Sequence, residues 1–253
     1  MKKLLSFASL IICISCFCNQ KNSKNSPDVV SGQIVTTEEH ETPPSEQPKT
    51  KTALEMELDK IGLVDIESIS NDIPVSLMYA RDDNFTGKIL YKDLNRAYLQ
   101  PEAAEALLKA QSYLKKNHPH LSLKVYDAAR PLSVQQVMFD MVKGTDQQIY
   151  VANPSKGGGL HNYGLAVDVT LCDAATGDTL TMGTHIDYFG KRAQVRYEKT
   201  FLADSTLSKE AYQNRCILRE AMTSAGYKVL LSEWWHFDFK TIAEAKASYS
   251  VIP

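Results

Sequence analysis

The residues best suited to chemistry lie in a glycine-rich stretch near the middle of the 253-residue chain. Glycines 157–159 precede His161, and Asp168 follows in a run that alternates as a β-strand does. A carboxylate on such a core-like strand is costly to desolvate unless something pairs with it. A metal ion held by His161 and Asp168 would do so, and so would neighbouring backbone amides. This stretch alone leaves both interpretations open.

A second stretch, residues 232–239, contains another histidine and more carboxylates. On a strand His236 and Asp238 share one face, and Glu233 lies in the turn just before them. The two tryptophans of the chain, Trp234 and Trp235, add apolar surface beside Glu233. Taken singly, a packed histidine and a turn glutamate are ordinary structural residues, so the second stretch is informative only in combination with the first.

Together the two stretches predict a catalytic zinc site. His161, Asp168 and His236 would provide two imidazoles and one carboxylate and leave a fourth position for water, whose pKa zinc lowers. Glu233 would be the general base, with a pKa raised by the apolar tryptophans. Arg130 lies at a strand-to-helix junction before a proline. It is either a surface arginine or the positive charge that stabilises the oxyanion of an attacked amide.

These stretches resemble the zinc D-alanyl-D-alanine dipeptidases of the VanX type, in the group that includes D-Ala-D-Ala carboxypeptidases and the hedgehog fold. The family's His-x-x-Gly-x-Ala-x-Asp occurs here at 161–168, and its Glu-Trp-Trp-His at 233–236. Asn-Phe-Thr-Gly at 84–87, and Met-Gly at 182–183 with Asp187, narrow the resemblance to the dipeptidases. The resemblance extends from about residue 72 to residue 239.

The resemblance implies one Zn²⁺ per chain on the three ligands, Glu233 as base and Arg130 as the transition-state stabiliser. It also implies that Tyr79 and Asp187 enclose the dipeptide, with Asp187 facing the substrate ammonium. Longer peptides, whose amide nitrogen carries no charge, would be excluded. One departure is Gly159, which stands where the family usually has a serine near the substrate. The exact dipeptide preference therefore stays open.

The elements that would position these residues predict an α+β fold. A central antiparallel sheet with flanking helices would carry the hedgehog/DD-peptidase-like zinc site on its open face. Strands are expected at 73–79, 121–126, 165–171, 228–231 and 236–239. Helices are expected from Pro101 to about residue 117, from Val134 to about Val142, and from the Ser208 cap to Ser224, with Gly226 after its end.

The middle helix of these three has its own expected details. Ser133 and Gln136 would form a capping box at its start. Its buried stripe would consist of four apolar residues, Val134, Val137, Met138 and Met141.

The N-terminus predicts export from a bacterial cytoplasm. Residues 1–18 combine a basic start with an apolar run too short to span a bilayer comfortably, as in an export signal. Ser15-Cys16 favours a lipoprotein signal, although Cys13 replaces the usual leucine; an ordinary cleaved signal and an uncleaved anchor are the alternatives. Residues 19–51 are polar and predict a disordered tether, which leaves 52–253 as the catalytic domain. The protein would be periplasmic or a membrane-anchored lipoprotein.

Net charge and cysteine content limit the classes of partner that the chain could bind. The formal net charge of −2 gives no basic footprint for nucleic acid. Outside the cytoplasm Cys172 and Cys216 would be either packing residues or a disulfide. The expected partner is a small dipeptide, with Cys16 as the site of a lipid anchor.

The predicted function is zinc-dependent hydrolysis of D-Ala-D-Ala to free D-alanine, in cell-wall peptide turnover or recycling. One alternative is a peptidoglycan D,D- or L,D-carboxypeptidase acting on longer stem peptides, against which Asp187 and residues 84–87 argue. Another is a non-catalytic zinc module that binds wall peptide. That module would have lost its base, whereas Glu233 is present. Export favours scavenging of released dipeptide over antibiotic resistance, a choice that the sequence does not decide.

Overall fold

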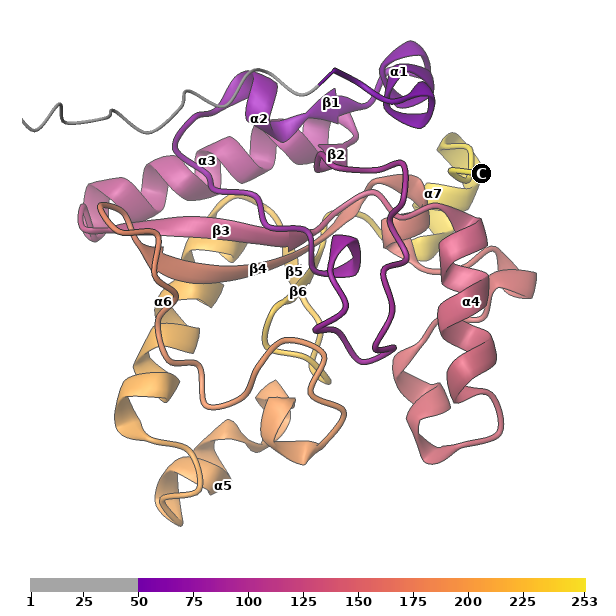
Figure 1. Ribbon diagram of the computed structural model, residues 1–253. Helices are drawn as coiled ribbons and strands as arrows, with labels where there is room; N and C mark the ends of the chain where they lie inside the picture. The colour runs from indigo at the N-terminus through magenta and orange to yellow at the C-terminus, as the bar shows by residue number, and fades with distance from the viewer. Residues whose placement is uncertain (1–49) are drawn as a thin grey trace, which may run out of the picture. The chain divides into compact units, whose positions relative to one another are not determined.

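A four-stranded antiparallel sheet organises residues 50–253, which are the residues that the computed structural model describes (Figure 1). Its strand order is β3-β4-β6-β5. The strands are β3 (Leu121–Asp127), β4 (Ala166–Asp173), β6 (His236–Asp238) and β5 (Lys228–Val229). A separate two-stranded sheet pairs β1 (Val64–Asp65) with β2 (Tyr98–Leu99). The predicted α+β fold with antiparallel strands and flanking helices is confirmed.

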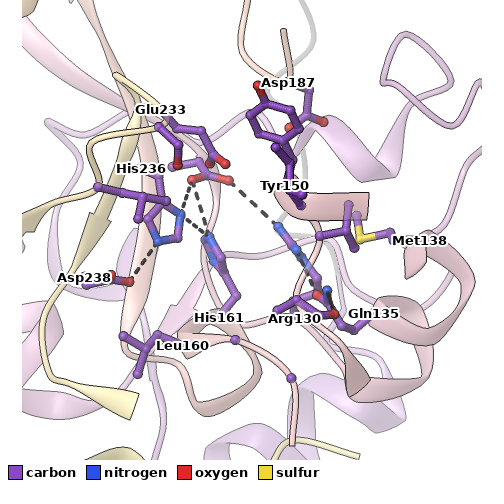
Figure 2. Close-up of a pocket in the computed structure, with 18 of the residues that line it drawn as sticks. Arg130, Gln135, Met138, Tyr150, Leu160, His161, Asp187, Glu233, His236 and Asp238 are labelled. Atoms are coloured by element: carbon purple, nitrogen blue, oxygen red, sulfur yellow. Dashed lines mark hydrogen bonds and ion pairs between the residues drawn. The ribbon is translucent and has the colours of Figure 1, made fainter. Parts of the chain in front are cut away.

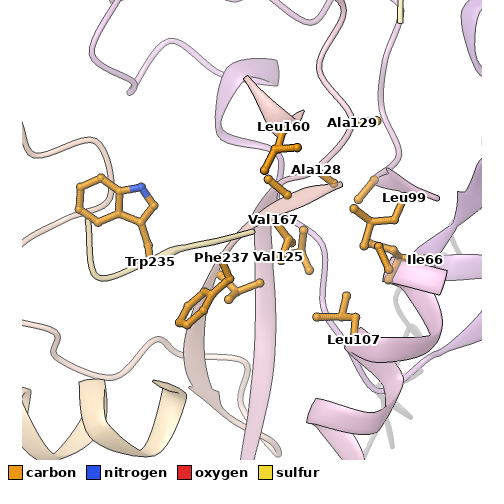
Figure 3. Close-up of a cluster of buried hydrophobic side chains, with 14 of the residues drawn as sticks. Ile66, Leu99, Leu107, Val125, Ala128, Ala129, Leu160, Val167, Trp235 and Phe237 are labelled. Carbon is orange, nitrogen blue, oxygen red and sulfur yellow. The ribbon is translucent and has the colours of Figure 1, made fainter. Parts of the chain in front are cut away.

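Two long helices cover the apolar face of the main sheet. Helix α3 (Pro101–Asn117) packs against β3 and against α6 (Lys209–Ser224) (Figure 1). Val125, Val167 and Phe237 of three neighbouring strands are fully buried, and Leu107 of α3 belongs to the same cluster (Figure 3). Because strand side chains alternate between faces, Asp168 and His236 point to the opposite face of the sheet.

The ends of the long helices follow their sequence signals. Pro101 occupies the first turn of α3, where a missing backbone N–H has no cost. Ser208 caps α6 and accepts a hydrogen bond from the Ala211 amide at 3.0 Å. Gly226 follows the end of α6 with a φ of +96°, a backbone conformation that favours glycine. These boundaries agree with those predicted.

The shorter elements connect these parts. The remaining α-helices are α1 (Ala53–Lys60), α2 (Ile66–Ile69), α4 (Leu132–Val142), α5 (Glu198–Ala203) and α7 (Ile242–Ser248). Single 3₁₀ turns are η1 (Met78–Ala80), η2 (Asp146–Tyr150), η3 (Pro154–Lys156), η4 (Leu160–Tyr163), η5 (Lys191–Ala193) and η6 (Val195–Tyr197).

The strand expected at 73–79 is wrong. Val75 forms an isolated parallel bridge to Val125 of β3, and the chain then turns into η1. The bridge has two hydrogen bonds, from Val125 N to Pro74 O and from Ser76 N to Val125 O, both 2.9 Å. The carbonyl of Tyr79 accepts from two later amides, at residues 90 and 91, which pulls the segment away from the sheet edge. Local turn bonding therefore overrides the strand-like pattern.

The expected start of α4 is also wrong, and its expected buried face is right for Val134 and Met138 only. The helix begins at Leu132 after Pro131, with no side-chain cap, so the predicted capping box does not form. Its buried residues are Gln135, Met138, Phe139 and Val142. Two residues of the predicted stripe, Val137 and Met141, are 43% and 41% exposed. The helix is turned so that the polar Gln135 faces inward, where it meets polar partners described below.

The structure tests only part of the predictions about cysteines, membrane-spanning helices and the N-terminal segments. Cys172 is buried and Cys216 half-buried, and both are free thiols, so no disulfide joins them in the described residues. Residues 50–253 contain no helix that is long and apolar enough to cross a membrane. The predicted signal, and the predicted tether up to residue 49, lie outside the described residues.

The core of the sheet predicts a matched pair of stability effects. Leu107→Ala empties a site that is 1% exposed, so we expect the free energy of unfolding to fall by about 2–5 kcal/mol. Met141→Ala removes a side chain that is 41% exposed, so we expect a change within about 0.5 kcal/mol. Urea unfolding followed by circular dichroism measures both. Equal losses in the two variants would contradict this description of the core.

Candidate active site

Three donor atoms from separate segments converge on the open face of the sheet (Figure 2). His161 Nε2 lies 3.1 Å from His236 Nδ1, and Asp168 Oδ1 lies 3.0 Å from His236 Nδ1 and 3.4 Å from His161 Nε2. Asp168 of β4 is directly opposite His236 of β6, and His161 is in η4, just before β4. The structure thus brings together the three residues that the sequence proposed as metal ligands.

The outer nitrogens of both histidines are already occupied. His161 Nδ1 is 2.7 Å from the carbonyl oxygen of Ala128, and His236 Nε2 is 2.8 Å from Asp238 Oδ1. If these outer nitrogens carry the protons, the inner nitrogens turn lone pairs toward Asp168. Three lone-pair atoms in such close contact repel one another unless a shared proton or a metal ion lies between them.

The spacing of the donor atoms fits zinc. With bonds of roughly 2.0–2.1 Å, a tetrahedral zinc ion separates its ligand atoms by about 3.3 Å. The three observed separations, from 3.0 to 3.4 Å, bracket that value. His161, Asp168 and His236 therefore suit this metal without rearrangement of the backbone.

The charges of the cluster also suit a cation. Burial acts to raise the pKa of Asp168, but the adjacent His161 and His236 hold it well below its usual range. Burial acts to lower the pKa of His236, but its hydrogen bonds to Asp168 and Asp238 outweigh this and keep that pKa well above the usual value. The site is rich in negative charge, and Asp168 is ionised, as a metal ligand must be.

The glycine run before His161 is a tight turn fixed by Asn162. Asn162 Oδ1 accepts from the amide of Gly159 at 2.9 Å, and its Nδ2 donates to the carbonyl of Arg130 at 2.9 Å. Gly158 has a φ of +69°, and a Cβ there would lie 2.1 Å from Asn162 Oδ1. Asn162 thus joins the His161 turn to the Arg130 segment, a role that its place inside the sequence motif did not reveal.

Arg130 lies at the floor of the site rather than on the surface. Its Nε donates to Asp127 Oδ2 at 2.9 Å and its Nη1 to Gln135 Oε1 at 3.0 Å. Its Nη2 lies 3.8 Å from Asp168 Oδ2, and its guanidinium lies 5.0 Å from the centre of the Tyr79 ring. Burial acts to lower the pKa of Arg130, but Asp127 keeps it well above the usual value. The guanidinium is therefore charged and held in one orientation.

Asp127 and Gln135 are the positioning residues that sequence reasoning missed. Asp127 ends β3 opposite Asp168, and Gln135 also donates through Nε2 to the carbonyl of Ala152 at 2.9 Å. Asp127 stands directly after an alternating strand, three residues before Arg130. That spacing was the signal that could have identified it. Nothing in the apolar pattern of α4 singles out Gln135.

Glu233 faces the same cavity from the turn between β5 and β6. Burial raises the pKa of Glu233 to about 8, with further contributions from the negative charges of Asp168 and Asp187. The expected tryptophan wall is wrong. Trp234 and Trp235 are outside the lining of this cavity in the described chain, and the Trp234 indole donates instead to Thr184 Oγ1 at 2.8 Å. The raised pKa thus comes from general burial and nearby carboxylates.

Asp187 lies across the cavity from the histidines (Figure 2), and Tyr79 lines the same cavity. The Tyr79 hydroxyl donates to Asp187 Oδ2 at 2.8 Å. Burial, followed by repulsion from Asp168, raises the pKa of Asp187 to about 7. Asp187 also has a φ of +61°, which is uncommon for a residue other than glycine. The geometry thus presents one carboxylate to the cavity, in a conformation that the surrounding loop must maintain.

The outer wall of the cavity is aromatic. The rings of Tyr150 and Phe189 stack with centres 5.0 Å apart, and Phe85 lies 4.9 Å from Phe189. Phe85 is carried by a turn in which Asn84 Oδ1 accepts from the Thr86 amide at 2.9 Å, which gives residues 84–87 a structural purpose. The cavity measures about 350 Å³, at the small end of the range for ligand pockets.

Comparison with known proteins agrees with this geometry. The model of the D-Ala-D-Ala dipeptidase family, peptidase M15, matches residues 59–251. The chain belongs to this family. It is 34% identical over 185 residues to the D-alanyl-D-alanine dipeptidase of Escherichia coli K12, covering 73% of this chain and 88% of that protein. It is 27% identical over 197 residues to the Enterococcus faecium protein of the same name, covering 70% and 91%. The family predicted from the sequence motifs is confirmed, and the protein is a peptidase.

Two solved structures show only a distant likeness. The LdcB LD-carboxypeptidase is 19% identical with a TM-score of 0.36, covering 59% of this chain and 63% of that chain. A Zn(II) complex of the vancomycin resistance D,D-pentapeptidase VanY is 14% identical with a TM-score of 0.33, covering 60% and 79%. Scores of this size carry no argument about this site.

Substitution of the proposed ligands should weaken metal binding. We expect His161→Ala and Asp168→Ala each to weaken Zn²⁺ binding by more than about 100-fold, because even loss of an outer partner of a ligand costs 10- to 100-fold. His120→Ala removes an exposed histidine and should leave binding unchanged. Equilibrium dialysis with atomic absorption measures the affinity. Undiminished binding by either ligand variant would show that the metal is held elsewhere.

Proposed function

We propose that this protein is a zinc-dependent dipeptidase that hydrolyses D-Ala-D-Ala to D-alanine, with one Zn²⁺ per chain. The observation that carries the proposal is the group of three donor atoms, 3.0 to 3.4 Å apart, at the floor of a small cavity. When bound by His161, Asp168 and His236, zinc supplies Lewis-acid activation of a water molecule for attack on the peptide carbonyl.

The residues around the ligands have separate roles in the reaction. Glu233 takes a proton from the attacking water and returns it to the leaving amine, which requires a carboxyl group whose pKa is near neutrality. Arg130 donates hydrogen bonds to the amide oxygen as negative charge develops on it. Asp127 and Gln135 hold the guanidinium in place before substrate arrives, so no reorganisation is needed during the reaction.

The choice of a dipeptide rests on Asp187 and the size of the cavity. The carboxylate of Asp187 accepts from the substrate ammonium, while the Tyr79 hydroxyl keeps that carboxylate oriented. A longer peptide presents an uncharged amide at this position and leaves Asp187 without a partner. The D configuration is supported by the names of the relatives. Nothing in the site favours the longer stem peptides of a carboxypeptidase.

The cellular role follows from the export signal predicted in residues 1–18. An exported enzyme meets dipeptide released from the cell wall, so we infer a role in wall-peptide turnover or recycling. The lipid anchor on Cys16 stays a prediction from the sequence. Fractionation of cells that express the full chain tests the location, and recovery in the cytosol alone would contradict it.

The decisive experiment combines substrates with a base variant. We expect the purified protein to release D-alanine from D-Ala-D-Ala, to stop on chelation, and to leave L-Ala-L-Ala, a wall pentapeptide and the N-acetylated dipeptide largely intact. Glu233→Gln should keep its zinc and lower kcat by about 10²- to 10⁴-fold, the usual value of a general base. Glu105→Gln makes the same change on an exposed residue of α3 and should be silent.

Two outcomes would overturn parts of this proposal. Absence of chelator-sensitive D-alanine release from the dipeptide would overturn the proposed activity. Loss of zinc in Glu233→Gln would show that Glu233 is a ligand and not a separate base.

The raised pKa of Asp187 predicts a pH dependence of binding. Only the ionised carboxylate pairs with an ammonium group, so affinity should fall as pH drops below about 7, the pKa that burial gives Asp187. We expect this decline for D-Ala-D-Ala binding to the inactive Glu233→Gln protein, measured by calorimetry between pH 5.5 and 8.5. Asp187→Asn in the same background should bind weakly with little pH dependence. Parallel pH curves for the two proteins would assign the titration to another group.

A further inference from the structure

One buried arginine holds both ends of the loop that carries Asp187. Arg215 of α6 is 1% exposed. Its Nε donates to the carbonyl of Met182 at 2.7 Å, and its Nη1 donates to the carbonyl of Arg192 at 3.1 Å. Residues 182–192, here called the Asp187 loop, contain no α-helix or β-strand. The two hydrogen bonds therefore act as a bracket across a segment that lacks regular backbone pairing of its own.

The same guanidinium also reaches the tryptophan next to the proposed base. Arg215 lies 5.5 Å from the centre of the Trp234 ring, and the Trp234 indole donates to Thr184 Oγ1 within the Asp187 loop. Cation–π contact of this kind is stronger where the cation is removed from water. Arg215, Trp234 and the loop thus form one connected unit, which includes the residue that follows Glu233 in the chain.

Close packing in this unit explains why glycine follows Met182. Gly183 has a φ of +81°, and a Cβ there would lie 2.4 Å from Leu207 Cδ1 and 3.5 Å from Arg215 Nη2. A side chain would therefore push the loop away from Leu207, just before α6, and away from the arginine. Glycine allows the backbone to lie close enough for the carbonyl of Met182 to accept from Arg215.

The arrangement is costly for the fold, which indicates that it serves the loop. Within residues 50–253, Arg215 Nη2 is one of two buried side-chain polar atoms without a hydrogen-bond partner, and such an atom usually destabilises a protein. Burial lowers the pKa of Arg215 to about 10, against the opposing charge of Glu198 at 3.3 Å. An apolar residue at this position would avoid the desolvation cost but could not bind the two carbonyls.

Asp187 needs external support to keep its conformation. Its φ of +61° lies in a region that residues with a side chain occupy at a cost, and such residues persist where the surroundings over-determine them. We propose that Arg215 is a positioning residue for substrate binding: by holding Met182 and Arg192, it keeps the Asp187 loop in the conformation that presents Asp187 to the dipeptide ammonium. This inference rests on the proposed function and concerns how its specificity is maintained.

The chain offers a matched control for the test. Arg219 lies one turn along α6 and pairs with the same Glu198 at 2.8 Å, and no hydrogen bond joins it to the Asp187 loop among the described residues. Arg215→Lys keeps the charge but replaces the planar fork with a compact ammonium that cannot serve both carbonyls. We expect Arg215→Lys to raise KM for D-Ala-D-Ala about tenfold with kcat within about twofold, the signature of lost ground-state binding. Arg219→Lys should leave both parameters near wild type.

A double-mutant cycle tests whether Arg215 acts through Asp187. Asp187→Asn alone should raise KM, and adding Arg215→Lys to it should cause little further increase, because residues in one network are not additive. Additive effects, or equal effects of Arg215→Lys and Arg219→Lys, would overturn the proposal.

Hydrogen exchange of the full-length protein provides a readout that does not depend on activity. Amides of residues 183–191 should exchange faster in Arg215→Lys than in wild type or Arg219→Lys, while β4 amides stay unchanged. Unchanged loop exchange would overturn the proposal, as would equal acceleration throughout the chain, which indicates general destabilisation. Suppose that wild type fails to hydrolyse the dipeptide while the exchange pattern appears as expected. The proposed function is then wrong, but Arg215 still holds the Asp187 loop in place.

Discussion

The register of β4 against β6 is the constraint on which the rest of the site depends. It places Asp168 opposite His236 and, one residue along each strand, pairs Val167 with Phe237. Val167 and Phe237 are buried against the helices, so a slip of one residue would turn apolar side chains toward the cavity and ligands toward the core. The hydrophobic core thus enforces the relative position of two of the three proposed metal ligands. Because both depend on one alternating pattern, the site cannot be lost by slippage without unfolding the sheet.

The charges around the cavity explain why it should receive cations. Asp168, Asp187 and Glu233 line it, while Arg130 is its single lining arginine or lysine within residues 50–253 and is already paired with Asp127. Burial raises the pKa of Asp187 to about 7 and that of Glu233 to about 8, and repulsion from neighbouring carboxylates adds to both shifts. A metal ion and a substrate ammonium would each relieve that repulsion. The same negative charge therefore favours both the proposed cofactor and a substrate with a free amino terminus.

The sequence predicted which side chains lie together where their positions depend on residue type and strand alternation. Asp168 and His236 come together because alternation places them on one sheet face, and His161 joins them from η4, just before β4. Arg130 turns inward after the end of a predicted strand. Prediction failed where local backbone bonding decides: residues 73–79 have a strand pattern but turn at η1. It also failed at α4, where a polar residue, Gln135, sets the buried face. Its partners, Arg130 and the Ala152 carbonyl, lie in other segments, which periodicity within one helix cannot detect.

Packing around Gly159 gives a structural reason for glycine at this position. The sequence suggested a lost hydroxyl, but a Cβ at Gly159 would lie 3.2 Å from the Ala152 Cβ, closer than ordinary packing. Ala152 is held in turn by Gln135, which orients Arg130. A serine at 159 would therefore require the exposed Ala152, whose carbonyl accepts from Gln135, to shift by a few tenths of an ångström. Gly159 is thus compatible with this particular wall, and restoring the hydroxyl of the family would require Ala152 to move as well.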